Sequence, residues 1–202
     1  MFALIENGQF VKIVNSNKGI TIGDNQYPKS IYNLWSEDER NAIGIYEVSV
    51  DNTNKKDEAY YINTDISYSY ANGVVTASYG TATPKPLDDI LFVEGDEIPS
   101  DKQVGDIKSY GLKGLEIAKI KTQAGGLLAP TDWYVIRYQE DNTKTIPTDV
   151  ATYRNEIRAK SDEMESQINA CTTVDELKTL FTWTQDEQGN ITRPLVSFPE
   201  VI

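Results

Sequence analysis

The stretch Pro147–Cys171, PTDVATYRNEIRAKSDEMESQINAC, decides the fold of the C-terminal part of the chain. Its apolar side chains follow one another at spacings of 3, 4, 7, 4 and 3 residues, which places them on one face of a helix. They are Val150, Tyr153, Ile157, Met164, Ile168 and Cys171. Charged residues, Arg154 among them, fill the other positions, and Pro147 suits the first turn because its missing N–H has no helical partner there. We therefore expect one long helix with one buried face.

A second helix is predicted upstream of this stretch. Residues 112–124 carry apolar side chains at nearly helical spacing, and Gly125-Gly126 is expected to end the helix. The two helices together can bury their apolar faces against each other. We therefore expect the long helix to pack against residues 112–128.

A short helix is predicted between these two. Pro130 marks a break, after which Thr131 or Asp132 can cap a helix that runs through Arg137. Trp133 begins this helix and can pack in the angle that Pro130 creates. We expect Trp133 to belong to the helical core.

The end of the chain carries one more helix signal and one turn signal. Thr173-Val174-Asp175-Glu176 has the spacing of a capping box and predicts a last short helix. Residues 182–202 are expected to form a hairpin and tail that turn at residues 187–190.

Two Asn-Gly pairs predict β-hairpins in the N-terminal part, because these residues accept positive φ in a type I′ turn. The pairs are Asn7-Gly8 and Asn72-Gly73, and the strands expected around them span residues 2–6, 9–14, 60–70 and 74–79. One strand of the first hairpin is expected to be buried on both faces.

The segment between the two hairpins holds a short helix and a strand. A capping box at Ser36–Glu39 starts the helix, which Gly44 can close. Residues 45–50 alternate apolar and polar as a half-buried strand does, whereas residues 15–24 are expected to form a loop.

These patterns divide the chain into regions of different structure. We expect an α+β protein with a β-rich N-terminal domain at 1–80, a linker at 81–111, a helical domain at 112–181 and a hairpin or tail at 182–202. The linker carries several prolines and glycines, with a short strand expected at Ile90–Val93.

The composition excludes several kinds of chemistry. The chain has no histidine, so Ser-His-Asp and Cys-His catalysis and His-ligated metal sites are excluded. Its single cysteine excludes an internal disulfide and a thiolate cage for zinc or iron–sulfur. There is no phosphate-binding glycine motif. We therefore expect no transition metal, haem or nucleotide cofactor.

The net charge of the chain is −12, from 19 basic and 31 acidic residues. A polyanion would be repelled over most of such a surface, so we expect no nucleic-acid partner. The chain has no apolar run of about 18 residues, and the opening MFALIENGQF lacks the features of a signal peptide. We expect no membrane span and a reducing cytoplasm, or a particle assembled there, as the environment.

Carboxylates are the only plentiful catalytic groups. They cluster in the expected linker at Asp88, Asp89, Glu94, Asp96 and Glu97, and a glycosidase needs only two carboxylates at the right separation. A solvated acidic surface explains such a cluster more simply, so we expect no catalytic residue.

Two further candidate sites have plainer explanations. Residues 51–58 offer oxygen ligands for calcium, but they lack the glycine and terminal glutamate of an EF-hand, which favours a polar turn. Cys171 lies on the apolar stripe of the long helix, which favours a small buried hydrophobic residue over a nucleophile.

Tyrosines on the predicted strands are the candidate partner-binding residues. They are Tyr60, Tyr61, Tyr68, Tyr70 and Tyr79. Tyrosine is enriched at protein interfaces because it buries a large area and keeps a polar group. The β-propensity of tyrosine accounts for the same pattern equally well.

Several motifs resemble one known group of proteins. The motifs are Leu127–Arg137 (LLAPTDWYVIR), Ile146-Pro147, Val150, Tyr153-Arg154, Arg158 and Cys171–Leu177 (CTTVDEL). They are similar to the C-terminal helical region of small tail-associated proteins of tailed bacteriophages, especially marine ones, some of which are labelled tail-fibre assembly proteins. The opening MFALIENG resembles their N-terminal hairpin. The resemblance covers residues 112–181 and the first dozen, and it does not extend to residues 15–110.

The resemblance implies a function in a phage tail and supplies no catalytic residue. We expect a virion structural protein of the tail, associated with the fibre or the baseplate, that binds other tail proteins as a homo-oligomer or as ring-bound copies. Its place would be the virion, assembled in the host cytoplasm. Two alternatives stay open: a tail-fibre assembly chaperone that leaves before the virion is complete, and a carboxylate-dependent glycan hydrolase on the tail.

Overall fold

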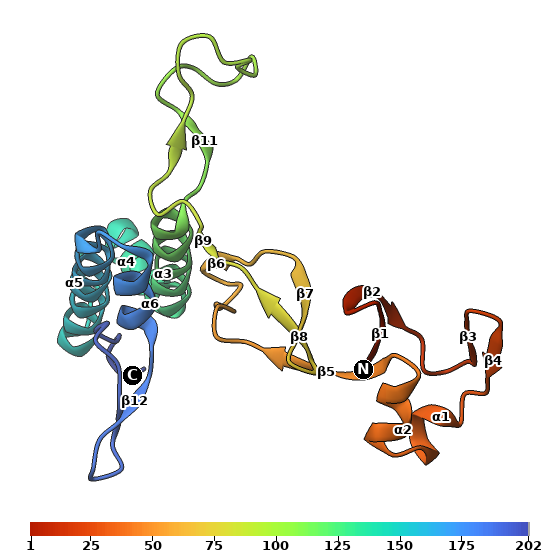
Figure 1. Ribbon diagram of the computed structural model, residues 1–202. Helices are drawn as coiled ribbons and strands as arrows, with labels where there is room; N and C mark the ends of the chain where they lie inside the picture. The colour runs from red at the N-terminus through yellow and green to blue at the C-terminus, as the bar shows by residue number, and fades with distance from the viewer. Residues whose placement is uncertain (202) are drawn as a thin grey trace. The chain divides into compact units, whose positions relative to one another are not determined.

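The computed structural model of the protein describes residues 1–201 and divides the chain into two compact units (Figure 1). The first unit is Met1–Thr83, and the second begins at Pro84. Strands dominate the first unit and long helices dominate the second, so the expected α+β fold class is confirmed. The division falls near the start of the segment 81–111, which the sequence presented as a linker.

A five-stranded sheet forms most of the first unit. In spatial order its strands are β2 (Gln9–Val14), β1 (Phe2–Glu6), β5 (Ile45–Asp51), β8 (Val74–Tyr79) and β7 (Ile66–Ala71). Neighbouring strands are antiparallel except β5 and β8, which are parallel. Both Asn-Gly turns have positive φ at each residue, 50° and 74° at Asn7-Gly8 and 53° and 81° at Asn72-Gly73. The two predicted hairpin turns are therefore confirmed.

Strand β1 is the one buried on both faces, whereas β2, whose residues 9–14 gave rise to that expectation, has only Val14 fully buried. On one face Ala3 and Ile5 pack against β5 and β8, and on the other face Leu4 packs against α1 (Ile31–Leu34). The sheet curls so that its two edge strands approach each other. Phe10 of β2 stacks on Tyr68 of β7 with the ring centroids 4.9 Å apart.

Short elements complete the first unit. Helix α2 (Glu37–Ala42) starts at the predicted capping box, in which the Ser36 amide donates to the Glu39 carboxylate at 2.7 Å. Strand β6 (Tyr61–Ile62) pairs with β9 (Thr83–Pro84). The segment 15–24, expected to be a loop, contains β3 (Ile20–Ile22), which pairs with β4 (Asn25–Tyr27). Strands of three residues are too short to give a periodic signal.

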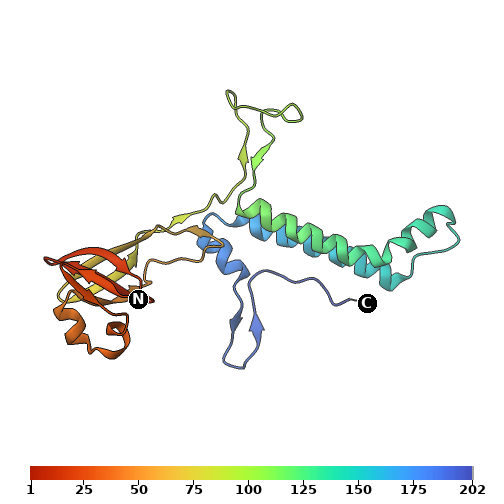
Figure 2. The ribbon, with the colours of Figure 1, turned by 90° about the vertical axis from the view of Figure 1, so that its right-hand side faces the viewer.

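The second unit is built on two long helices that run antiparallel to each other, α3 (Leu112–Leu128) and α5 (Thr148–Ala170). Figure 2 shows α3, in green, lying along α5. Every member of the predicted stripe is buried, from Val150 to Cys171, and Ile157 and Ile168 are fully enclosed. The buried Ser161 fills the gap of seven residues in that stripe. The predicted packing of the long helix is thus confirmed for residues 112–128.

The expected end of α3 at Gly125-Gly126 is wrong. The helix continues to Leu128 and passes into a 3₁₀ turn at Ala129–Thr131. Leu127 and Leu128 pack against Tyr153 and Ile157 of α5. Burial of these two leucines stabilises two extra helical residues, and this outweighs the low helix propensity of glycine.

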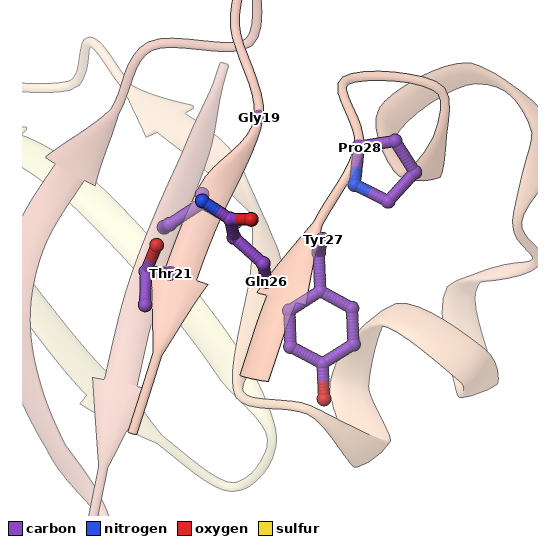
Figure 3. A pocket seen from close by; sticks show the side chains of 6 residues that line it. Gly19, Thr21, Gln26, Tyr27 and Pro28 are labelled. Atoms are coloured by element: carbon purple, nitrogen blue, oxygen red, sulfur yellow. The ribbon is translucent and has the colours of Figure 1, made fainter. Parts of the chain in front are cut away.

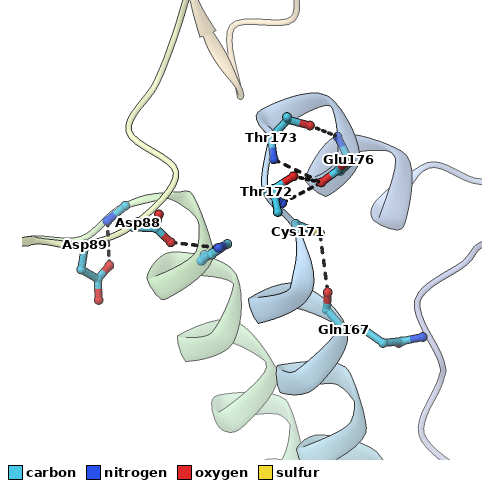
Figure 4. Close-up of polar contacts among 9 residues, drawn as sticks. Asp88, Asp89, Gln167, Cys171, Thr172, Thr173 and Glu176 are labelled. Carbon is cyan, nitrogen blue, oxygen red and sulfur yellow. Dashed lines mark hydrogen bonds and ion pairs between the residues drawn. The ribbon is translucent and has the colours of Figure 1, made fainter.

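The segment 86–89 caps the N-terminus of α3 (Figure 4). The amides of Leu112 and Lys113 donate to the carbonyl oxygens of Pro86 and Leu87, at 2.9 and 3.0 Å. The Gly111 amide donates to the Asp89 carboxylate at 2.8 Å. A Cβ on Gly111 would overlap the backbone of the segment. This close approach accounts for a glycine whose φ of −81° any residue could adopt.

The expected linker also contains a β-hairpin. Strand β10 (Ile90–Leu91) overlaps the strand predicted at Ile90–Val93 and pairs with β11 (Ile107–Ser109), which the sequence did not indicate. Both strands belong to the second unit. The hairpin extends from the N-terminal end of α3 in both ribbon views (Figures 1 and 2).

The last elements follow the predictions. Helix α6 (Val174–Phe181) begins at the Thr173 capping box, where the Glu176 amide donates to the Thr173 hydroxyl at 3.1 Å (Figure 4). Strands β12 (Thr184–Gln185) and β13 (Ile191–Thr192) form the predicted C-terminal hairpin.

Candidate protein-interaction surface

Helix α4 (Asp132–Glu140) leaves its apolar side chains uncovered. It follows the 3₁₀ turn directly, and none of its nine residues is buried. Trp133 is 49% exposed and Ile136 is 58% exposed. The expectation that Trp133 belongs to the helical core is therefore wrong. We define the α4 surface as Trp133, Tyr134, Ile136, Arg137 and Tyr138.

The guanidinium group of Arg137 contacts two aromatic rings of the α4 surface, those of Trp133 and Tyr134. The ring centroids of Trp133 and Tyr134 lie 3.8 Å apart. The guanidinium carbon of Arg137 lies 4.8 Å from the Trp133 centroid and 5.4 Å from the Tyr134 centroid. Such cation–π contacts fix the rings in place while leaving much of their area open. The surface can therefore offer preformed apolar area to a partner.

A buried arginine fixes the turn that leads into α4. Arg154 of α5 is only 7% exposed, which corrects its placement among the solvent-facing charges of the long helix. Its Nη1 donates to the Leu128 carbonyl oxygen at 3.0 Å and to the Thr131 hydroxyl at 2.7 Å. Its Nη2 forms an ion pair with Asp132 at 2.8 Å. We call Arg154 and its three partners, Leu128, Thr131 and Asp132, the Arg154 latch.

The latch ties three consecutive elements together. Leu128 ends α3, Thr131 ends the 3₁₀ turn, and Asp132 begins α4. The Thr131 hydroxyl also donates to the Leu128 carbonyl at 2.8 Å. A buried charge is tolerated only when it is paired and hydrogen-bonded, and Arg154 meets both conditions. The direction of α4 relative to α3 and α5 is therefore set by specific bonds.

The motifs behind the phage resemblance fall into two groups in space. Leu128, Thr131, Asp132 and Arg154 pack or bond within the second unit. Trp133 and Ile136 belong to the same run of sequence and stay exposed. The contacts of the first group within the unit are enough to account for those residues. The side chains of the second group remain available for contact with another molecule.

The sequence pattern predicted a buried Trp133 and an exposed Arg154, whereas in the structure Trp133 is exposed and Arg154 is buried. One signal could have warned of this: at about 100° per residue, the four consecutive residues Trp133–Ile136 spread around α4 and do not form the narrow apolar stripe of a helix that packs into a core. Arg154 lies beside Tyr153 at the edge of the buried stripe, and its long aliphatic stem allows burial once partners exist.

The five candidate tyrosines lie mainly on internal contacts of the first unit. Tyr61 is buried, and the other four are partly buried. Tyr68 stacks on Phe10, and Tyr70 meets Tyr46 edge-on with the centroids 4.9 Å apart. Lys55 lies over the Tyr79 ring. Packing within the chain thus uses most of the surface that these rings could offer to a partner.

Three of the five acidic residues of the segment 88–97, Asp88, Asp89 and Asp96, hold local structure. Asp89 caps Gly111, and Asp88 forms an ion pair with Lys113 at 2.9 Å (Figure 4). Asp96 bonds to Lys108 at 2.8 Å, and this hydrogen bond lowers the pKa of Asp96. Among residues 1–201, no three His, Cys, Asp or Glu side chains gather in a way that could hold a metal ion.

Cys171 and the segment 51–58 also have structural roles. The Cys171 thiol is buried and contacts the Gln167 carbonyl at 3.5 Å (Figure 4). Burial raises the pKa of this thiol, which opposes formation of the nucleophilic thiolate. Asp51 accepts from the Thr53 amide and Asp57 from the Ala59 amide, both at 2.9 Å, as in ordinary polar turns.

A hollow of about 460 Å³ lies beside the β3–β4 hairpin (Figure 3). The side chains of Thr21, Gln26, Tyr27 and Pro28 line it together with Gly19 and Ile20. These residues bring neither a carboxylate nor a basic group into the hollow. Its lining therefore offers no general acid or base near neutral pH.

Comparisons with known proteins give no match. No protein-family model matches the chain, and no curated protein or solved structure is similar enough to count as a match. Within residues 1–201, no helix has both the length and the apolar character that crossing a membrane requires.

Proposed function

We propose that this chain is a structural protein of a bacteriophage tail, associated with the fibre or the baseplate, that works by binding other tail proteins. The resemblance of Leu127–Arg137 and its companion motifs to phage tail-associated proteins supports the setting. The exposed α4 surface, held in place by the Arg154 latch, supports the mode of action. That surface is the observation that carries the proposal.

The energetics of the α4 surface favour protein contact. Tryptophan, tyrosine and arginine are the residues that most often dominate binding energy at protein interfaces. Four of the five residues of the α4 surface belong to these types, and three of them, Trp133, Tyr134 and Arg137, contact one another. A partner that covers Trp133 and Ile136 removes apolar area from water without any rearrangement of this chain.

The experiment changes the α4 surface and measures tail incorporation. A phage carrying Trp133→Ser with Ile136→Ser should contain about tenfold less of this chain per purified particle, because an interface loses its central apolar contacts. Both residues are exposed, so the variant protein should keep its stability within about 0.5 kcal/mol. Quantitative mass spectrometry of the particles measures the first quantity, and chemical unfolding of the purified protein measures the second.

The chain offers a closely matched control. Trp183 and Ile191 are also exposed, and Arg193 lies 4.8 Å from the Trp183 ring centroid, the same distance as in the α4 surface. The variant Trp183→Ser with Ile191→Ser should be incorporated normally. Normal incorporation of the α4 variant together with loss of the control variant would place the contact on the C-terminal hairpin and contradict the proposal.

A further inference from the structure

The β10–β11 hairpin exposes apolar side chains on a projecting element. We define the arm as residues 90–110, from the start of β10 to the residue after β11. Its exposed apolar residues are Ile90, Leu91, Val93, Val104 and Tyr110, with exposures between 45% and 59%. A hairpin of two short strands would seldom stay folded alone in water, so this arm needs other sources of order.

The tip of the arm, residues 92–106, is held in place by hydrogen bonds within the arm. Phe92 is buried, and its amide and carbonyl bond to the Asp106 carbonyl and the Gly105 amide, both at 2.9 Å. Asp96 accepts from the Val93 amide at 3.0 Å and pairs with Lys108 at 2.8 Å. The apolar side chains of the tip are therefore presented on an ordered frame.

The base of the arm is fixed to α3. The carbonyls of Pro86 and Leu87 and the carboxylate of Asp89 satisfy the amides of Leu112, Lys113 and Gly111. The free amides at the start of a helix need such partners. The segment 86–89, which leads directly into the arm, is therefore bonded to α3, the helix that packs along α5. The arm therefore leaves the helices at a defined point.

The charge of the tip selects the kind of partner. Residues 93–106 contain five acidic side chains and one basic side chain. Asp96 and Asp106 bond within the tip, whereas Glu94, Glu97 and Asp101 are exposed and show no bond within the part of the chain that the structure describes. A surface that combines exposed valines with unpaired carboxylates complements an apolar surface bordered by Lys and Arg.

We propose that the arm is a docking element for a partner protein with an apolar surface rimmed by basic residues. Val93 and Val104 enter the apolar part, and Glu94, Glu97 and Asp101 face the basic rim. A second copy of this chain does not fit, because its net charge of −12 repels the acidic tip. The inference depends on the proposed function in one respect: the experiment is carried out in phage-infected cells and purified phage particles.

The experiment introduces a photo-crosslinking amino acid at Val93 and, separately, at Val104 in infected cells. We expect both positions to give one and the same crosslinked phage protein, with a basic patch, in cells and in purified particles. The control position is Val11 on the edge strand β2, which is 45% exposed. It should not give that product.

A charge-reversed variant tests the electrostatic part. Changing Glu94, Glu97 and Asp101 to Lys should lower the crosslink yield about tenfold, and raising the salt concentration should weaken the wild-type contact in the same direction. The control makes the same change of charge at Glu6, Asp24 and Asp65, which are exposed in the first unit. That variant should keep the wild-type yield.

The outcomes separate this inference from the proposed function. Particles that contain the chain but give no more product at Val93 than at Val11 overturn the arm proposal alone. A product with a second copy of this chain, or with an acidic partner surface, overturns it as well. The specific product in cells together with particles that lack the chain supports the arm and rejects a place in the virion. Absence of the specific product from cells together with absence of the chain from particles rejects both the arm proposal and a place in the virion.

Discussion

Arg154 connects the packed part of the second unit to the surface that we propose as its interface. The side chain combines a buried position with three bonded partners at the turn before α4. Of these partners, Thr131 is buried and Leu128 is partly buried. Their polar groups lose a charged hydrogen-bond donor if the arginine is removed, and water replaces it poorly at the buried Thr131.

Replacing Arg154 with Met should therefore cost about 3 kcal/mol of unfolding free energy, because methionine keeps part of the aliphatic packing but removes every bond of the latch. Chemical denaturation measures the change. Arg158→Met is the control: Arg158 lies one turn further along α5, is exposed, and within residues 1–201 donates only to the Arg154 carbonyl, at 3.3 Å. It should cost less than about 0.5 kcal/mol. Equal losses in both variants would show that the latch has no special role.

Two glycines, Gly111 immediately before α3 and Gly125 within it, should respond in opposite directions to the same substitution. Gly111→Ala forces a Cβ into the backbone of the capping segment, so it should destabilise the second unit by about 1–3 kcal/mol. Gly125→Ala adds a methyl group in open space inside the helix and should stabilise it by about 0.8 kcal/mol. Thermal and chemical unfolding of both variants measure the pair. A neutral Gly111→Ala would mean that the segment 86–89 does not cap α3.

The start of α6 should be sensitive to acid. Hydrogen bonds from the Thr172 amide and hydroxyl, at 2.6 and 2.9 Å, lower the pKa of Glu176 below its ordinary value of 4.5. A lowered pKa in the folded state gives stability that is present above pH 4.5 and is lost as the pH falls through the folded value. Glu176→Gln should remove this pH-dependent part. Plotted against pH, the free energies of unfolding of the wild type and of Glu176→Gln should converge below pH 4.5. A constant difference between the two free energies across this pH range would contradict the assignment.

Local signals predicted the elements that depend on a few neighbouring residues. The two Asn-Gly turns, the capping boxes at Ser36 and Thr173 and the stripe of α5 all rest on short-range chemistry. The end of α3 could not be predicted in the same way, because leucines after Gly125-Gly126 gain their stability from contact with Tyr153 and Ile157. The capping of α3 by residues 86–89 likewise joins segments more than twenty residues apart.

The candidate site was less accessible from the sequence than the fold. A periodic pattern identifies which side chains share a face, but it does not identify what covers that face. This is why Trp133 was expected in the core, and why the tyrosines of β7 and β8 were expected to face a partner when Phe10 and Tyr46 pack against two of them. Only the three-dimensional arrangement separates the latch from the α4 surface.

At the scale of the whole molecule, the chain combines two compact units with a net charge of −12 and, within residues 1–201, shows no cluster of metal-binding side chains. The second unit holds both proposed contact elements, the α4 surface and the arm. Both present apolar side chains on a frame that hydrogen bonds fix in advance. Such preorganisation lowers the entropic cost of binding and suits a protein whose task is assembly.

Mass spectrometry of purified, infectious particles tests the central claim most directly. The account predicts that this chain is present in a constant ratio to the other tail proteins and that the ratio survives repeated gradient purification. Abundant chain in infected cells together with none in the particles would contradict a structural role, and would identify the protein as an assembly factor that leaves before the virion is complete.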